Sequence, residues 1–334
     1  MPDLLPLAID NLLSPIILFF ALGFGAALLR SDLSIPEAFA KAMALYLMLA
    51  IGFKGGVELN KQGLNWTVAV ILLAGAALSF VIPMIAYTLL RTFTRLGQAD
   101  AAAVSAHYGS ISVVTFVAGS EFLTLMGIGF EGYMVAVMAI METPAIVTGI
   151  WLARRNLKGT AEARPRRQKG LLDRDLMREI FLNGSVVILI GSFVIGWITG
   201  PKGLDAIAPF VVGPFKGVLC LFLLDMGLVA ATRLRGASEL TWRLVLFGIT
   251  MPVVGASLGL TTGWALGLGP GETALLALLC GSASYIAVPA SMRLAVPEAS
   301  PGIYLTLSLA ITFPFNLTFG IPLYFSVAAA ISSP

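Results

Sequence analysis

The sequence predicts an all-α polytopic membrane protein. Of its 334 residues, 58% are hydrophobic and only 12% carry a charge, which is about half the charge density of soluble domains. Long uncharged apolar stretches recur from one end of the chain to the other, and each approaches the roughly 20 residues that cross a bilayer as a helix. The few charges are clustered, so they do not supply the polar surface that a soluble fold of this length requires.

Function classes that depend on a known catalytic or nucleotide-binding motif are not indicated. The sequence contains no Walker motif, no His-Glu-x-x-His pair and no nucleophile elbow. Cys220 and Cys280 both fall in apolar stretches and suggest neither a disulfide framework nor a zinc site. The net charge of +3 comes mostly from one segment and gives no indication of nucleic-acid binding. We expect a protein that is not an enzyme and holds no cofactor.

About ten membrane-spanning helices are expected from the apolar stretches. The expected spans are 11–29, 38–59, 66–90, 100–120, 133–153, 180–199, 213–234, 243–267, 272–292 and 303–328. Segment 154–179, between the fifth and sixth spans, holds nine of the 21 Lys and Arg residues. The positive-inside rule makes this loop cytoplasmic. With five spans on each side of it, both termini lie outside the cell (inner) membrane.

The two halves of the chain carry similar patterns in the same order. FKGVLCLFLLDMGLVAATRL from Phe215 is similar to AKAMALYLMLAIGFKGGVEL from Ala40. The matched residues are Lys41 with Lys216, Gly52 with Gly227, Leu59 with Leu234, Trp66 with Trp242, Asp100 with Glu272, Pro144 with Pro314 and Thr148 with Thr318. Because each half holds an odd number of spans, the second half enters the membrane from the opposite side. This predicts an inverted repeat of 1–153 and 180–334, as in many secondary transporters.

A Gly-Ser-x-Ser sequence interrupts the fourth and the ninth expected span. Gly109 and Gly281 each lie nine residues after the acid that opens the span; nine helical residues rise about 14 Å, or about half of a ~30 Å hydrocarbon core. Freed backbone groups are costly in lipid, so such breaks face protein or a wet cavity. We expect the breaks to meet at the midplane and to bind one small oxyanion through N–H groups and hydroxyls. The hydroxyls are those of Ser110, Ser112, Ser282 and Ser284.

Close packing of small residues between helices is the alternative interpretation of these two stretches. The matched position of the two copies favours the binding site.

A second candidate site is a cation site around Glu142, which lies within the fifth span just before Pro144. The symmetry-related stretch of the tenth span contains Thr312 and Asn316. A buried carboxylate in a membrane usually has a partner or a pathway. Carboxylate, amide and carbonyl oxygens together form a site for a hard cation. We expect sodium, or a proton carried by Glu142; a structural ion pair or an interhelical hydrogen bond is the alternative.

Three further polar residues lie inside expected spans. His107, the only histidine, precedes the first break, and a packed, hydrogen-bonded role is favoured over a proton relay. Lys54 and Asp225 lie in the matched second and seventh spans, where a structural salt bridge between them is expected.

The stretch from Cys280 to Tyr324, CGSASYIAVPASMRLAVPEASPGIYLTLSLAITFPFNLTFGIPLY, resembles the C-terminal region of the cyanobacterial sodium-dependent bicarbonate transporters. METPAIVTGI is similar to the motif of that family's fifth span, and IGFKGGVEL and LLDMGLVAA are similar to its second and seventh spans. The resemblance covers nearly the whole chain. One departure stands beside the first break, where Val113 and Val114 replace further Gly and Ser, which removes a hydroxyl and adds bulk.

The resemblance implies a core domain (66–153 and 243–328) and a gate domain (11–59 and 180–234). It also implies a homotrimer, sodium coupling and inward bicarbonate transport. A PII-like regulator would bind on the cytoplasmic side, toward which segment 154–179 faces. The family's anion site maps onto Gly109 to Thr115 and onto Gly281 to Tyr285, which adds Thr115 and Tyr285 to the candidate residues.

The resulting hypothesis is sodium-coupled uptake of bicarbonate by alternating access. Moving one anion into an inside-negative cell costs about 2.3 kcal/mol per 100 mV, and one co-transported Na⁺ cancels this cost. The first alternative is a sodium- or proton-coupled transporter of another small carboxylate anion. The second alternative is an anion channel.

Overall fold

The prediction of an all-helical membrane protein is confirmed by the computed structural model, which describes residues 4–63, 65–155, 178, 182, 184–237 and 239–332. Within these residues every regular element is a helix. Eight helical segments of the described part are long and apolar enough to cross a membrane. Two shorter apolar helices, α2 (Pro15–Leu28) and α12 (Pro270–Cys280), accompany them. Most of the basic segment 154–179 lies outside the described residues.

Six of the long segments are single helices. They are α3 (Glu37–Gln62), α4 (Trp66–Phe93), α7 (Tyr133–Arg154), α9 (Gly184–Val211), α10 (Phe215–Arg235) and α11 (Trp242–Ala265). Helix α9 turns sharply at Gly200, whose φ of 58° is accessible to glycine, so its first part ends where the sixth span is expected to end.

The other two long segments are composite. Gln98–Leu125 consists of α5 (Gln98–Gly109) and α6 (Val113–Leu125). Pro301–Ile331 consists of α14 (Pro301–Leu305), the π-helix η2 (Thr306–Thr312), α15 (Phe313–Phe315), the π-helix η3 (Asn316–Gly320) and α16 (Ile321–Ile331). Two short helices complete the described chain: α1 (Leu4–Leu12) and α13 (Val288–Ala295).

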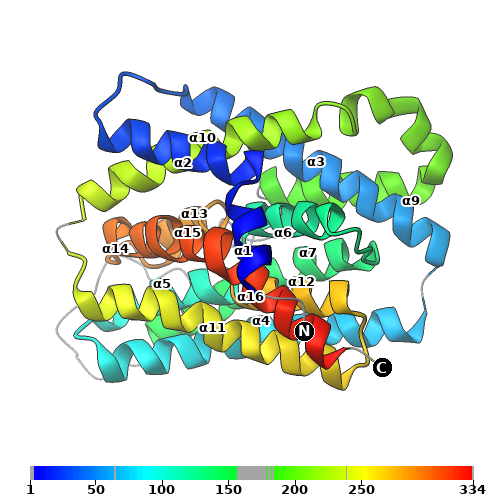
Figure 1. Cartoon of the computed structure of the whole chain (residues 1–334). Helices are drawn as coiled ribbons and strands as arrows, with labels where there is room; N and C mark the ends of the chain where they lie inside the picture. Colours follow the sequence, from blue (N-terminus) through cyan, green and yellow to red (C-terminus); the bar gives the residue numbers. More distant parts are fainter. Residues whose placement is uncertain are drawn as a thin grey trace.

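The helices form two packed groups that lie against each other (Figure 1). Helices α2, α3, α9 and α10 lie together at the top of the view, whereas α4 and α11 lie at the bottom with the broken helices between. Within the first group α3 packs along α9 and α10 packs along α2. Gly52 lies against the carbonyl of Leu189 in α9, and its matched residue Gly227 lies against the carbonyl of Phe20 in α2. Glycines allow this close backbone approach between membrane helices.

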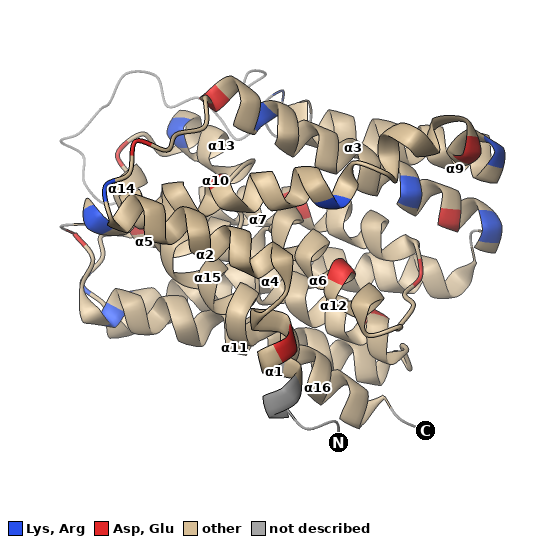
Figure 2. Ribbon diagram, turned by 45° about the horizontal axis from the view of Figure 1, so that its top comes forward, with Lys and Arg blue, Asp and Glu red and all other residues tan. Residues whose placement is uncertain are grey.

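Charged residues lie mainly near the helix ends, and the helix middles are largely apolar (Figure 2). Large apolar side chains stay exposed on the outer helices, for example Leu73 of α4, Ile198 of α9 and Trp264 of α11. A soluble protein rarely exposes so many large apolar side chains together. Such exposure is typical of helix faces that contact lipid.

Candidate functional site

The first break separates α5 from α6 at 110–112, as the sequence predicts. At Ser110 the backbone is extended (φ −85°, ψ 161°). Helix α6 restarts at Ser112, whose hydroxyl accepts a hydrogen bond from the Thr115 N–H (3.2 Å) and caps the helix. Gly109 lies directly against the ring of Pro83 in α4, so there is no room for a side chain at that position.

The second break covers 281–287, between α12 and α13. Gly281 packs against α11, where a β-carbon would lie 2.7 Å from the carbonyl oxygen of Pro252. The side-chain amide of Asn316 donates a hydrogen bond to the Gly281 carbonyl (2.8 Å), which satisfies a backbone group freed at the break. Pro289, in the first turn of α13, favours the restart of the helix there.

The two breaks are in direct contact. The Ser284 N–H donates to the carbonyl of His107 (2.8 Å), and the Ser112 N–H donates to the hydroxyl of Ser282 (3.0 Å). All four residues are buried. The fold therefore brings together the predicted residues of both breaks: Gly109, Ser110, Ser112, Gly281, Ser282 and Ser284. Some of their hydrogen-bonding groups bind the other break and are not free for a ligand.

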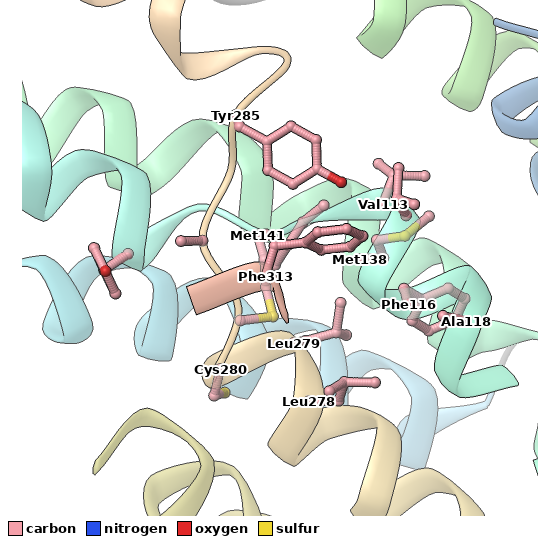
Figure 3. Packing of buried hydrophobic residues seen from close by; sticks show 14 of the residues in the cluster. Val113, Phe116, Ala118, Met138, Met141, Leu278, Leu279, Cys280, Tyr285 and Phe313 are labelled. Carbon is pink, nitrogen blue, oxygen red and sulfur yellow. The ribbon is translucent and has the colours of Figure 1, made fainter. Parts of the chain in front are cut away.

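A small cavity of about 10 Å³ lies between the breaks. It is lined by Met48, Ile111, Ser112, Val113, Glu142, Ser284, Tyr285 and Ile286. The volume is about that needed for a single water. The ring of Tyr285 packs on Phe313, with 5.4 Å between centroids, and its hydroxyl points toward Val113 (Figure 3).

Several hydrogen-bonding groups around this cavity are unused. The buried hydroxyl of Ser110 has no partner among the described residues, and that of Tyr285 lies near Ser112 without hydrogen-bond geometry. The N–H groups of Val113 and Val114, in the first turn of α6, also have no acceptor among the described residues. A helix N-terminus with free N–H groups attracts an anion.

Thr115, in the first turn of α6, stabilises the helix cap formed by Ser112. Its hydroxyl donates to the Ser112 hydroxyl (2.9 Å) and its N–H donates to the same oxygen, so it fixes the cap. Thr115 does not line the cavity.

Glu142 lies at the cavity, beside a contact between α7 and α4. The hydroxyl of Ser79 in α4 donates to the Met141 carbonyl (2.5 Å) and accepts from the Ala145 N–H (3.2 Å). It thus lies between the Met141 carbonyl and the Ala145 N–H, the two backbone groups on either side of Glu142 and Pro144. Glu142 is 3% exposed and makes no hydrogen bond or ion pair with any described residue. An isolated buried carboxylate needs a cation or a proton.

Thr312 and Asn316 are not hydrogen-bonded to Glu142. The Thr312 hydroxyl donates to the Gly248 carbonyl (2.7 Å) and shares a hydrogen bond with the hydroxyl of Tyr108 (2.6 Å). Oδ1 of Asn316 accepts from Tyr324 (3.1 Å), while its amide holds the second break. The two residues flank Phe313–Phe315, with a wide π-helical turn on each side, and such turns are frequent at functional sites.

Sequence reasoning missed Ser79 and Tyr108, which carry no motif. A serine in a neighbouring apolar helix becomes significant only when the fold sets it against the proline of α7. His107 is packed as predicted: its Nδ1 is 2.7 Å from the Ala103 carbonyl, and its ring stacks on Tyr304 with 4.5 Å between centroids.

Two larger cavities lie toward opposite ends of α10. The large cavity, about 1090 Å³, is lined by the end of α2, by the second half of α10 including Asp225, and by 300–306. The Lys54 cavity, about 480 Å³, is lined by 51–58 of α3, by 120–132 and by Phe215 at the start of α10. The expected Lys54–Asp225 salt bridge is absent from the described residues, because the two side chains line different cavities.

Apolar membrane-spanning helices, two broken helices in contact and an isolated buried carboxylate define a polytopic membrane protein of the transporter class. A family model of the Na⁺-dependent bicarbonate transporter superfamily matches residues 15–329. The chain therefore belongs to this family, as its sequence motifs predict. No curated protein matches the sequence significantly.

Proposed function

We propose that this protein is a secondary active transporter that takes up bicarbonate together with sodium by alternating access. The contact between the two breaks beside Glu142 is the observation that carries the proposal. In this proposal the anion lies between the breaks and accepts hydrogen bonds from the N–H groups of Val113 and Val114. The contributing residues are Gly109, Ser110, Ser112, Thr115, Gly281, Ser282, Ser284 and Tyr285.

Alternating access is supported by the small volume of the site and by the Lys54 cavity, which is lined by the next turn of the same helix α3. A cavity of about 10 Å³ does not hold bicarbonate, so the breaks and the facing helix α3 must separate for loading. Met48 of α3 lines the site, and Ile51, one turn further along, lines the Lys54 cavity. Movement of α3 against the broken helices would therefore open the site toward that cavity.

The proposed inverted repeat of 1–153 and 180–334 is supported by reciprocal contacts. Oδ1 of Asp100 accepts from the N–H of Ser300 (2.8 Å), just before α14. Oε1 of its matched residue Glu272 accepts from the N–H of Glu131 (3.0 Å), just before α7. Each acid at the start of a broken helix thus fixes the start of a helix in the other half, as a two-fold axis requires.

The division into a moving and a fixed domain follows the two helix groups. Helices α2, α3, α9 and α10 correspond to the proposed gate (11–59 and 180–234). The broken helices with α4, α7 and α11 correspond to the proposed core (66–153 and 243–328). The matched Thr148 and Thr318 support the symmetry of the core, since their hydroxyls donate to the carbonyls of Pro144 (3.0 Å) and Pro314 (2.8 Å).

Sodium coupling is proposed through Glu142, whose carboxylate pairs with no Lys, Arg or His among the described residues. A Na⁺ at this carboxylate would offset the charge of the anion in the same cavity. Thr312 and Asn316 would contribute Oγ1 and Oδ1 only after reorienting from their present hydrogen bonds. Asn316 also holds the Gly281 carbonyl, so cation binding there would reshape the second break.

Orientation and assembly complete the proposal. The basic segment 154–179 would lie on the cytoplasmic side of the inner membrane, with both termini outside. Assembly as a homotrimer and binding of a PII-like regulator rest on the family resemblance alone.

The test is uptake of labelled bicarbonate into proteoliposomes, with the sodium gradient and the anion varied independently. Saturable uptake that requires inward-directed sodium is expected. A flux that neither saturates nor responds to sodium contradicts the proposal and indicates a channel.

A small carboxylate such as acetate is the second candidate substrate, because Met48, Ile111 and Val113 give the cavity an apolar wall. Acetate that competes with bicarbonate more strongly than unlabelled bicarbonate itself would favour it.

A further inference from the structure

The Lys54 cavity contains charged groups that the proposed transport site does not use. It lies between α3, the end of α6 and the first turn of α10. Lys54, Glu58, Glu121, Ser120 and Thr124 provide its polar lining, and Phe215 forms an apolar wall. With about 480 Å³ it accommodates a small hydrated anion, which the cavity of about 10 Å³ between the breaks does not.

The carboxylates of this cavity are already paired. Glu121 is 3.0 Å from Nζ of Lys216, which joins α6 to α10, and Glu58 is 2.7 Å from Nζ of Lys61. Lys54 makes no ion pair with any described residue, although Glu121 acts on it at longer range. Its Nζ lies 4.3 Å from the ring centroid of Phe215. A ring face stabilises an ammonium but leaves its charge uncompensated.

The Lys54 cavity and the proposed substrate site are both lined by helix α3. Met48, Ile51, Gly55 and Glu58 follow each other at helical spacing; Met48 lines the substrate site and the other three line the Lys54 cavity. Lys54 lies six residues, or less than two turns of helix, from Met48, a rise of about 9 Å along α3. The Lys54 cavity and the substrate site are therefore lined by neighbouring turns of the same helix.

We propose that the Lys54 cavity is a second anion-binding site, in which the Lys54 ammonium holds one small monovalent oxyanion before it passes to the breaks. This inference rests on the proposed function for the identity of the anion. Of the described charged side chains that line the cavity, Lys54 alone lacks an ion-pair partner, so an anion there would neutralise its charge. A cleft with apolar walls strengthens the potential of the Lys54 ammonium.

A purely structural Lys54 is the competing explanation, in which the aliphatic stem packs and the ammonium extends toward water. The two explanations differ in what sodium chloride does. An attraction of an anion to Lys54 weakens as ionic strength rises, since the screening length falls from about 30 Å at 0.01 M to about 8 Å at 0.15 M. Packing of the stem does not respond in this way.

The test compares three variants of the full chain in proteoliposomes. Lys54→Gln removes the charge, Lys54→Arg keeps it, and Lys202→Gln is the matched control on an exposed position of α9. For Lys54→Gln we expect the KM for bicarbonate to rise about three- to tenfold, the effect of losing one partly exposed charge contact. Vmax of Lys54→Gln stays within about twofold of the wild-type value. The difference in KM between Lys54→Gln and the wild type becomes smaller as the sodium chloride concentration rises. Lys54→Arg and Lys202→Gln keep the wild-type KM.

A readout independent of transport uses bromide as a probe anion. In a structure determined in sodium bromide, anomalous density next to Nζ of Lys54 is expected in the wild-type protein and in Lys54→Arg, but not in Lys54→Gln. Absence of this density in the wild type overturns the inference. So does a KM for Lys54→Gln equal to that of Lys202→Gln, with or without bromide at Lys54. Wild-type protein that fails to take up bicarbonate refutes the proposed function instead, and the bromide density alone then decides whether Lys54 binds anions.

Discussion

The two breaks begin with the same Gly-Ser-x-Ser sequence but are built differently. The first spans only 110–112 and restarts at once in α6, with Ser112 as its cap. The second spans 281–287, leads into the short helix α13 and depends on Asn316 to satisfy a carbonyl. The first break therefore presents a helix N-terminus with free N–H groups, whereas the second supplies side chains that cover it. We infer that anion binding depends mainly on the first break and closure of the site on the second.

The largest effect is expected at Glu142, which lines the cavity beside the first break. Glu142→Ala removes the isolated carboxylate, so sodium no longer promotes anion binding and sodium-dependent uptake is lost. The control is Glu37→Ala, at an exposed position in the first turn of α3. Uptake is measured with and without a sodium gradient, and sodium dependence retained by Glu142→Ala would refute the role of this residue. Glu142→Gln, which keeps the size of the side chain, separates loss of the cation from loss of the fold.

The next effect compares the two break glycines. In Gly109→Ala the new β-carbon would overlap the rigid ring of Pro83, whereas in Gly281→Ala it would meet the carbonyl oxygen of Pro252 at 2.7 Å. Overpacking costs about 1–3 kcal/mol, and we expect the upper end for Gly109→Ala. Thermal unfolding in detergent measures the difference. Equal stability of Gly109→Ala and the wild type would contradict the close packing of the first break on α4.

A smaller effect separates the hydroxyls that join the breaks. Ser282→Ala leaves the buried N–H of Ser112 without its acceptor, at a cost of about 1–3 kcal/mol. Ser112→Ala removes the cap of α6, at a cost of about 1 kcal/mol. Ser105→Ala is the control, because this buried hydroxyl bonds only within α5. The midpoints of thermal unfolding are compared. If Ser282→Ala is as stable as Ser105→Ala, the hydrogen bond between Ser112 and Ser282 does not hold the breaks together.

The smallest effect concerns Glu131, in the loop that Glu272 fixes. Burial raises the pKa of Glu131, and the nearby carboxylates of Glu272 and Glu58 raise it further. Because the folded protein then holds this proton more tightly than the unfolded chain, the charged form lowers stability as pH rises through the raised pKa. Glu131→Gln should therefore raise the melting temperature slightly at pH 7, and the gain should vanish as pH falls below the ordinary glutamate value. A gain that persists at pH 4 would contradict this cause.

The arrangement of the broken helices could be predicted from the sequence, and the details of the cation site could not. Gly109 and Gly281 follow matched acids at equal spacing, so local sequence and membrane thickness together indicate breaks at one depth. The environment of Glu142 depends on Ser79, which is 63 residues away in the sequence and forms hydrogen bonds with the backbone of α7 only in the folded protein. Likewise Thr312 pairs with Tyr108 across the two halves of the chain. Such contacts between distant helices leave no periodic or motif signal.

The most direct test of the shared anion site is a cryo-EM map of the protein in sodium bicarbonate, compared with a map in a bicarbonate-free sodium salt. We predict a compact density that appears only with bicarbonate, within hydrogen-bonding distance of the N–H groups of Val113 and Val114 and of the Tyr285 hydroxyl. In the same map the breaks should lie further apart than they do around the small cavity described above. A bicarbonate density elsewhere in the membrane region, with Ser284 still bonded to His107 and the cavity unchanged, would contradict the account.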